Sequence, residues 1–348
     1  MQFTTPFRAD SIDALSETTT LSAFLGPVSH VWRTPLQTVG FTGATHERWL
    51  VSLDSGEHVR LVAKRVRPSK DWISCRTGDT RGREASLLGE PALNAVWESF
   101  ECPYIAFATA ADDVLLLMHD LSPHLVPDVR EPISRAQEDR LIAALAALHA
   151  RFWASPALDL PWLTSPRMLG GLLDARVAAD REALATLPET IRSNVERGWT
   201  AALKRLPHDV ARSLSAPADD LPGLPRTLLH GDVKVANFAF PPDRRVAAFD
   251  WAMLGTGPAT LDVGWYVAVN ASRLTRSKDD LLAFYRSELD ARLETPLAAE
   301  TWTAIEKAGI VMGARMLLWS KALALEGGRT GADEEWEWWV DRLEAALS

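Results

Sequence analysis

The sequence has 348 residues, a length that favours two lobes or domains over one compact core. Hydrophobic residues make up 47% of it and charged residues 24%, the balance of an ordinary soluble globular protein, and no run of 18 or more apolar residues predicts a membrane span. The net charge of -9 argues against a nucleic-acid partner, because binding to a phosphate backbone needs a basic surface.

The N-terminus and the cysteines indicate where the protein works. MQFTTPFRADSIDALSE lacks a basic region followed by a long apolar run, so no secretory signal is predicted and a cytoplasmic location is expected. Cys75 and Cys102 are too few and too scattered for a disulfide framework or a zinc site. A reducing compartment explains them as ordinary packing residues.

Strand patterns fill the stretch from residue 35 to 118. Three short runs rich in Val, Leu, Thr and Trp, separated by glycine-bearing turns, predict an antiparallel meander, and these runs are TPLQTVGFTG, THERWLVSLDSG and EHVRLVAKRV. EASLLGEPALNAVWESF then predicts one helix from Glu84, and YIAFATAADDVLLLM predicts a hairpin with Asp112 and Asp113 at its turn. The first third of the chain is therefore expected to hold five strands and one helix.

Helical periodicity begins after Leu121. Ser134 followed by Gln137 fits a capping box, and apolar residues then recur at helical spacing as far as Phe152. Further helices are predicted at roughly 174–187, 189–205, 278–292, 298–326 and 332–347. The second part of the chain is thus expected to be mostly α-helical, and only LLHGDVKVANFAF and RRVAAFDWAML indicate strands there.

Polar residues interrupt the apolar stretch LLHGDVKVANFAF, residues 228 to 240. Asp232 and Asn237 lie five positions apart in a loop, and Asp250 follows 13 residues later at the end of the run VAAFD. Two carboxylates and an amide brought together by two short hairpin strands make an all-oxygen site, which suits Mg²⁺ rather than zinc. This pattern favours phosphate chemistry.

Phosphoryl transfer gives each of these side chains a task. Asp232 can accept the proton of an attacking hydroxyl, while Asn237 and Asp250 can hold the metal against the phosphates. Lys234, two residues from the expected base, is placed to reach the terminal phosphate. The alternative is a pair of buried hairpins with capping carboxylates, but caps do not require this whole set of spacings.

HGDVKVAN followed by FDWAMLGTGPATLDVGW resembles the signature of the aminoglycoside phosphotransferase and choline kinase-like families, which share the protein-kinase fold. The pattern is HGDxxxxN, then a strand ending in DW, then GxGPxxxD, and such a run at fixed offsets is far more specific than a lone glycine-rich loop. The resemblance implies that Asp232 is the catalytic base and that Asn237 and Asp250 are metal ligands. It also implies that His230 and Asp262 brace the catalytic loop.

The implied fold is α+β and bilobal. Residues 1–118 would form an N-lobe with a five-stranded antiparallel sheet plus a helix, and residues 119–348 a mainly α-helical C-lobe. The implied cofactors are ATP and Mg²⁺. Such folds need a glycine-bearing hairpin over the phosphates, and TVGFTGAT offers Gly40, Thr42 and Gly43 for it.

Kinase-like folds also need a lysine on the third strand and a glutamate on the helix that follows. Lys64 and Glu84 occupy these places, so they are expected to form an ion pair that positions the α- and β-phosphates. Glu90 is the fallback partner of Lys64. Without such a pair, Lys64 would be an exposed strand residue and Glu84 a solvated acid in the first turn of a helix.

LLLMHDLS, residues 115 to 122, falls where the hinge between the lobes is expected. The backbone of Met118, His119 and Asp120 would hydrogen-bond adenine there, so the side chains of these residues carry little information. A lone histidine in a connector, such as His119, is more often a surface or hinge residue than a catalytic one.

Two positions depart from patterns known in related families. Lys234 stands where many members of the two families carry a second histidine. Protein serine/threonine kinases carry a lysine at this offset, so Lys234 is expected to contact the terminal phosphate in their manner. Trp251 and Ala252 follow Asp250 in place of the Phe-Gly of protein kinases, which fits the small-molecule branch.

Only 11 residues separate Asp250 from Asp262, too few for a long phosphorylatable activation loop that would also bind a peptide. We therefore expect an ATP- and Mg²⁺-dependent phosphotransferase that acts on a hydroxyl of a small molecule such as an aminoglycoside-like antibiotic, a sugar or an amino alcohol. A protein kinase is the less favoured enzyme, and a nucleotide-binding pseudokinase scaffold is the non-enzymatic alternative. A pseudokinase usually lacks the base, a metal ligand or the strand lysine, whereas this chain retains all of them.

The chain has 14 tryptophans, of which Trp265 and Trp319 are the better candidates for a pocket wall. Packing is nevertheless the more ordinary role for both. The expected partner is a hydroxylated small molecule, and no nucleic-acid, membrane or obligate protein partner is expected.

Overall fold

The computed structural model describes residues 5–37, 43–126 and 131–348. The chain divides into two compact units, one formed by residues 1–127 and 236–252 and the other by residues 128–235 and 253–348. Helices make up 52% of the structure and strands 16%, so the expected α+β class is confirmed. The expected lobe boundary between residues 118 and 119 stays a prediction.

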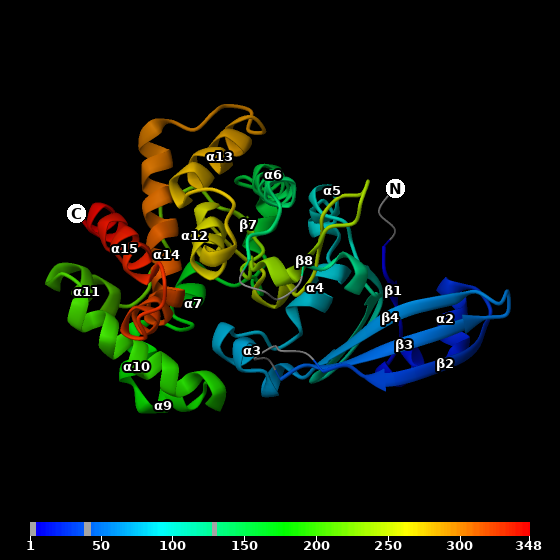
Figure 1. The fold of residues 1–348 in the computed structure, drawn as a ribbon. Coiled ribbons are helices and arrows are strands. Elements are labelled where there is room, and N and C mark those ends of the chain that lie inside the picture. Colours follow the sequence, from blue (N-terminus) through cyan, green and yellow to red (C-terminus); the bar gives the residue numbers. More distant parts are fainter. Residues whose placement is uncertain (1–4, 38–42, 127–130) are drawn as a thin grey trace. The chain divides into compact units, whose positions relative to one another are not determined.

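A six-stranded sheet in the order β1-β5-β6-β4-β3-β2 forms the centre of the first unit. Its strands are β1 (Phe7–Arg8), β2 (Val28–Pro35), β3 (Thr45–Leu53), β4 (His58–Val66), β5 (Tyr104–Ala110) and β6 (Asp113–His119). The strands β2 to β6 pair antiparallel, as expected, and the short β1 adds a parallel edge beside β5. Figure 1 shows β2, β3 and β4 side by side, with α2 (Thr18–Leu25) packed against β2. Two further helices of this unit are α1 (Ile12–Leu15) and α3 (Trp72–Thr77).

The first predicted strand is misplaced. The structure has β2 at Val28–Pro35, before most of the stretch TPLQTVGFTG, and residues 38–42 of that stretch lie outside the described residues. β2 is the last strand of the sheet, beside β3, and exposes most of its side chains, so its sequence lacks the apolar alternation by which a half-buried strand is recognised. This edge strand is therefore hard to find from hydrophobicity.

The single helix expected after β4 is interrupted at Pro91. α4 (Arg83–Gly89) and α5 (Val96–Ser99) are separated by a 3-10 turn over Pro91–Leu93. Pro91 has no N–H to donate and disfavours a helical conformation at Glu90, so α4 ends there. The helix that carries the predicted glutamate is thus only seven residues long.

A small hairpin belongs to the first unit although it lies far along the sequence. β8 (Phe238–Ala239) pairs antiparallel with β9 (Ala247–Ala248). After β9, the fully buried ring of Trp251 meets Trp97 and Phe100 edge-on, with centroids 5.9 and 6.0 Å apart. This aromatic packing fixes the end of the hairpin against α5.

Helices form most of the second unit (Figure 1). α6 (Arg135–Arg151) begins at Ser134, which forms the predicted capping box with Gln137. The other helices are α7 (Pro166–Gly170), α8 (Ala175–Ala179), α9 (Arg181–Ala185), α10 (Glu189–Arg205), α11 (His208–Ser215), α12 (Thr260–Val269), α13 (Lys278–Asp290), α14 (Ala299–Glu326) and α15 (Ala332–Leu347). Two short strands, β7 (Thr227–Leu229) and β10 (Gly255–Gly257), pair antiparallel beside them.

Two of the differences between this unit and the sequence prediction have a clear physical reason. The helix expected at 174–187 is divided into α8 and α9, because Asp180 ends α8 and its carboxylate caps the N-terminus of α9. α12 is not predicted at all. Nine of its ten residues are buried, so it has no polar face and therefore no amphipathic signal.

α14 is long and apolar enough to cross a membrane on length and composition alone. Half of its most apolar window is buried inside the structure, where α14 contacts α10, α12 and α15. Arg315 on this helix lies 3.4 Å from Asp174, and Lys321 lies 2.9 Å from Glu335. These contacts are those of a core helix within the second unit.

Candidate active site

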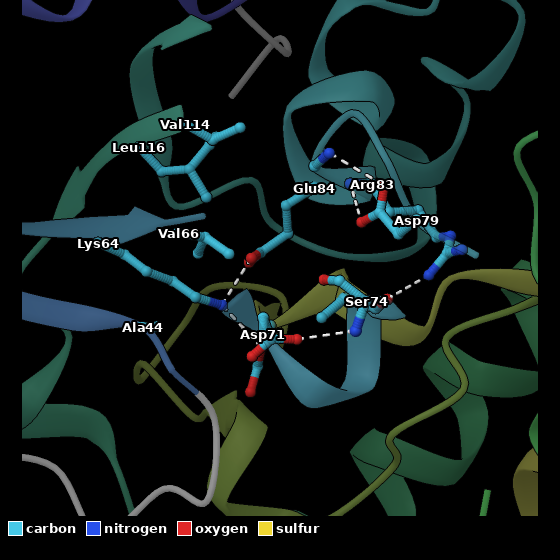
Figure 2. Close-up of a pocket in the computed structure, with 13 residues that line it drawn as sticks. Ala44, Lys64, Val66, Asp71, Ser74, Asp79, Arg83, Glu84, Val114 and Leu116 are labelled. Atoms are coloured by element: carbon cyan, nitrogen blue, oxygen red, sulfur yellow. Dashed lines mark hydrogen bonds and ion pairs between the residues drawn. The ribbon is translucent and has the colours of Figure 1, made fainter. Parts of the chain in front are cut away.

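Lys64 on β4 lies at the centre of an ion-pair cluster in the first unit. Its Nζ is 2.6 Å from Oε2 of Glu84 on α4 and 2.7 Å from Oδ1 of Asp250. Figure 2 shows the Lys64 side chain pointing toward Glu84. Lys64 and Glu84 are buried, whereas the Asp250 side chain keeps 24% of its surface exposed. Glu90 takes no part in this cluster and instead accepts a hydrogen bond from the N–H of Ala92.

The cluster keeps its ammonium group charged. Burial by itself would lower the pKa of Lys64, but the carboxylates of Asp250 and Glu84 outweigh burial and hold that pKa above its ordinary value. The Tyr104 hydroxyl donates to Oε1 of Glu84 at 2.6 Å and accepts from the N–H of Asp250 at 3.2 Å. Burial and the Glu84 carboxylate raise the pKa of Tyr104, so the phenol stays neutral. A fixed ammonium of this kind is suited to binding phosphate oxygens.

Asn237 and Asp250 lie at one end of the β8–β9 hairpin. Phe238 pairs with Ala248, and the N–H of Phe249 donates to the carbonyl of Asn237 at 3.2 Å. Asp250 has φ = +63°, the left-handed region that residues other than glycine seldom adopt and that Asp and Asn tolerate best. Backbone conformations of this kind cluster at functional sites.

The donor set at this end of the hairpin fits Mg²⁺. Asn237 offers an amide oxygen and Asp250 a partly exposed carboxylate. Mg²⁺ usually binds one or two protein oxygens and completes its coordination with water and substrate phosphates. Within the described residues, no group of three or more His, Cys, Asp or Glu could hold a metal ion by itself. The two side chains thus fit a metal that shares its coordination with a phosphate ligand.

A pocket of about 370 Å³ opens beside Lys64 in the first unit. Figure 2 shows its lining, which comprises Ala44, Lys64, Val66, Asp71, Ser74, Asp79, Gly82, Arg83, Glu84, Val114, Leu116, Asp250 and Ala252. The Asp71 carboxylate accepts from the N–H of Ser74 at 2.8 Å and from the N–H of Gly43 at 3.1 Å. Gly43 of the predicted glycine hairpin is thereby tied to the pocket wall, while Gly40 and Thr42 lie outside the described residues.

The segment predicted as the hinge lies at the end of β6. Met118 and His119 are its last residues, and Asp120 follows. The N–H of His119 donates to the carbonyl of Pro103 at 3.0 Å, and that of Asp120 donates to the carbonyl of Arg60 at 3.0 Å. Both amides are engaged within the first unit, and the expected contact of this segment with adenine stays a prediction.

The loop after β7 is held by Asp262, in the first turn of α12. The Asp262 carboxylate accepts from the backbone N–H groups of His230 and Gly231, each at 2.8 Å. It also lies 3.2 Å from Nε2 of His149, whose Nδ1 is 2.6 Å from the Tyr285 hydroxyl. All of these side chains are buried, so the loop starts from a fixed backbone position.

Asp232 follows in this loop and is 7% exposed. Its Oδ2 lies 2.8 Å from Nζ of Lys234, and its Oδ1 accepts from Nε1 of Trp265 at 3.0 Å. Trp265 stands three positions after Asp262 on α12, so both residues face the same loop. The structure therefore brings His230, Asp232 and Asp262 together in the second unit.

Sequence reasoning missed several supports of the two clusters, namely Tyr104, His149, Asn270 and Tyr285. Asn270 holds the end of the loop, because its Oδ1 accepts from the N–H of Val235 and its Nδ2 donates to the carbonyl of Val233, both at 3.0 Å. The sequence did offer a signal for Asn270, because it is a single polar residue at the end of the apolar run of α12. A buried amide needs hydrogen-bond partners, so such a residue indicates a supporting role.

The two tryptophans considered for a pocket wall have different surroundings. Trp265 lines a pocket of about 220 Å³ in the second unit, together with Leu169, Gly231, Met253, Leu261, Asp262, Met312 and Met316. The indole of Trp319 donates to the carbonyl of Met316 on its own helix at 3.0 Å. Trp265 therefore both contacts Asp232 and borders a cavity.

The sequence matches a known protein family. The model of the phosphotransferase enzyme family matches residues 42–299, more than half of the sequence. The chain belongs to this phosphotransferase family. Membership makes it a small-molecule phosphotransferase, as the HGDVKVAN motif predicts. No curated protein sequence matches the phosphotransferase.

Several solved structures are similar to this phosphotransferase. Choline kinase LicA from Streptococcus pneumoniae has 16% identity and a TM-score of 0.48, with 94% of this chain and 97% of that chain covered. An aminoglycoside phosphotransferase from Alicyclobacillus acidocaldarius has 14% identity and a TM-score of 0.47, with 94% and 93% covered. A spectinomycin phosphotransferase, in complex with ADP and its antibiotic, has 13% identity and a TM-score of 0.49, with 95% and 96% covered.

Gly231 of the phosphotransferase permits a test of the loop geometry. It has φ = +84°, and a Cβ at this position would lie 2.2 Å from the carbonyl oxygen of Met253. An alanine would have to adopt a left-handed conformation and also displace backbone, so we expect Gly231→Ala to lower the free energy of unfolding by more than about 3 kcal/mol.

Gly223→Ala is the matched control in the same unit. Gly223 has φ = +85° with nothing within 4 Å of the added Cβ, so only the backbone cost of about 1–2 kcal/mol applies. Urea denaturation measures both changes. Equal losses in the two variants would show that the close approach of Gly231 to Met253 does not matter.

Proposed function

We propose that this phosphotransferase transfers the γ-phosphate of ATP to a hydroxyl of a small molecule, with Mg²⁺ bound by Asn237 and Asp250. The observation that carries the proposal is the Lys64 ammonium, held within 2.7 Å of the Glu84 and Asp250 carboxylates beside a pocket. Such a charge is fixed in place before the ligand arrives, so little reorganisation is needed when phosphates bind.

Asp232 is the proposed base. As the acceptor oxygen attacks the γ-phosphorus, the bond from that phosphorus to the β–γ bridging oxygen breaks, ADP leaves, and the hydroxyl proton passes to Asp232. Trp265 and Lys234 each contact one oxygen of this carboxylate, which orients it. Lys234 is further proposed to contact the terminal phosphate.

The remaining predicted residues support these steps. Lys64, positioned by Glu84, is proposed to bind the α- and β-phosphates, under a hairpin that includes Gly40, Thr42 and Gly43. When bound, Mg²⁺ supplies positive charge to the β- and γ-phosphate oxygens. The segment Met118–Asp120 is proposed to face the base. His230 and Asp262 are proposed to keep the catalytic loop in place, since Asp262 accepts from the N–H of His230 and the N–H of Asp232 donates to Nδ1 of His230 at 3.3 Å.

The proposed acceptor is a hydroxylated small molecule such as an aminoglycoside-like antibiotic, a sugar or an amino alcohol. The short connection between Asp250 and Asp262 supports this choice over a peptide substrate. The net charge of -9 supports a protein that works without a nucleic-acid partner, and we propose the cytoplasm, where ATP is available, as its location.

A screen of hydroxylated metabolites and antibiotics for acceptor-stimulated ADP release tests this function, with the Asp232→Ala variant as the blank. We expect at least one chemical class to raise ADP release above the acceptor-free rate in the native enzyme alone. Equal stimulation of the blank would remove Asp232 from the mechanism. Binding of Mg-ATP without stimulated release by any acceptor would favour a nucleotide-binding scaffold.

A further inference from the structure

Two rows of side chains cross the sheet of the first unit on the face that carries Lys64. In the strand register, Arg48 of β3 lies opposite Val62 of β4, and Val62 lies opposite Met118 of β6. The adjacent row consists of His46, Lys64 and Leu116. Because residues two apart on a strand point to the same face, Arg48, Val62 and Met118 share the face of Lys64.

If Lys64 binds the phosphates of a nucleotide, as the proposed function states, the base can lie on either side of Lys64 along β4. Toward Val66 lies the pocket, whose lining combines apolar side chains such as Val66 and Val114 with the polar side chains of Asp71, Ser74, Asp79 and Arg83. Toward the end of β6 the sheet offers the apolar side chains of Val62 and Met118. Both directions offer apolar surface, but the second leads to Met118–Asp120, the segment proposed to face the base. The base is therefore expected on the row that includes Arg48.

Arg48 is held over this row by an ion pair. Its Nε lies 3.4 Å from Oδ2 of Asp120, the residue after β6, and the Asp120 side chain is only 8% exposed. Asp120 is fixed in turn, because its Oδ1 accepts from the N–H of Ser122 at 3.0 Å. Since the pair joins β3 to the end of β6, it spans β4 on this face, beside the row of Val62 and Met118. The Arg48 side chain keeps 46% of its surface exposed and can meet a ligand.

We propose that Arg48 stacks on the purine of the bound nucleotide and that Asp120 positions its guanidinium. A guanidinium is planar and stacks on aromatic faces, which an aliphatic side chain at this place would not do. Because every base presents a π-face, this contact favours neither adenine nor guanine. Arg48 is thus a nucleotide-binding residue for which the family motif gives no signal.

Isothermal titration of the full chain with Mg-ATP and with Mg-tripolyphosphate tests this contact, because tripolyphosphate has the phosphates but no base. Arg48→Ala is expected to raise the Kd of Mg-ATP about tenfold, the loss of one desolvated cation–π contact, and to leave the Kd of tripolyphosphate within about twofold. Arg48→Lys keeps the charge but loses the planar group, and is expected to show most of the same selective loss.

Arg65→Ala is the matched control. Arg65 lies on β4 with its side chain on the opposite face, where its Nε is 2.9 Å from Oδ1 of Asp113. Its removal subtracts the same charge from the sheet, and we expect both Kd values to stay within about twofold of the native values.

The outcomes separate this inference from the proposed function. If the native chain binds neither ligand, the proposed function fails whatever Arg48 does. If the native chain binds both ligands but Arg48→Ala weakens them equally, Arg48 acts on the phosphates and the stacking proposal is overturned. Unchanged or tighter binding of Mg-ATP by Arg48→Ala overturns it as well, because the ion pair with Asp120 would then make no contact with the base or would oppose its entry.

Discussion

Asp232→Ala is expected to lower kcat by a factor of about 10² to 10⁴ and to leave the Kd of Mg-ATP within about twofold. The substitution removes the proposed proton acceptor but leaves unaltered the residues proposed to hold the nucleotide, Lys64 and Asp250. Initial rates of ADP release measure the first quantity and titration calorimetry the second. A variant with near-native turnover would show that another group takes the proton.

Trp265→Phe is a milder test of the Asp232 carboxylate than Asp232→Ala. It keeps a ring in α12 but removes the N–H that donates to Oδ1 of Asp232 at 3.0 Å. A hydrogen bond to a charged group contributes about 1.5 kcal/mol or more, so we expect kcat to fall about tenfold while the KM for ATP stays unchanged. A change in the KM for ATP instead of kcat would show that Trp265 does not act through the base.

Asp250→Ala is expected to weaken Mg-ATP binding at least about 100-fold, because it removes the proposed charged ligand of the metal, which is also one of the two carboxylates beside Lys64. Titration with ATP in Mg²⁺ and in a chelator measures how much of the affinity depends on the metal. In excess Mg²⁺, the Kd of ATP should be much higher for the variant than for the native protein. In the chelator, the Kd values of the two proteins should become similar. Unchanged affinity for Mg-ATP would exclude Asp250 as a metal ligand.

Asp250→Asn separates the metal role from the backbone conformation. Asn tolerates φ = +63° as well as Asp does, whereas Ala is strained there. We therefore expect Asp250→Asn to keep the free energy of unfolding near the native value and still to lose most of the Mg²⁺-dependent affinity. A loss of affinity confined to the alanine variant would indicate that backbone strain, and not the carboxylate, is responsible.

Two pairs of site residues could be predicted because the members of each pair lie on elements that are close together in the sequence. Asn237 and Asp250 could be paired because each flanks a strand of one short hairpin, so the turn alone places them at the same end. Lys64 and Glu84 could be paired because a strand lysine and a glutamate on a later helix follow in this order in kinase-like folds, although α3 lies between β4 and α4 here. The order of the elements along a short stretch of chain was enough in both cases.

The supporting residues could not be predicted in this way. His149 meets Asp262 and Tyr285 across 113 and 136 positions, and Tyr104 meets the N–H of Asp250 across 146 positions. Such contacts depend on how whole helices and strands pack, which no local pattern describes. A polar residue within an apolar run is the local sequence feature that indicates a buried hydrogen bond. It identifies one of the two residues but not its partner.

Two errors in the fold prediction, the misplaced β2 and the missing α12, have one physical origin. Hydrophobic periodicity reveals an element only when one face is buried and the other is wet. β2 exposes most of its side chains and α12 buries nearly all of them, so neither shows a period. The interrupted helices at Pro91 and Asp180 are different, because a proline and a capping carboxylate in the sequence mark both breaks.

A crystal structure of the native chain with Mg²⁺ and a non-hydrolysable ATP analogue is the most direct test of the proposed phosphate transfer. The predicted result is a Mg²⁺ ion bound by oxygens of Asn237 and Asp250, the Lys64 ammonium on the phosphates, and the Asp232 carboxylate facing the γ-phosphate. A triphosphate or a metal bound by other residues, with these four side chains turned toward separate regions, would contradict it.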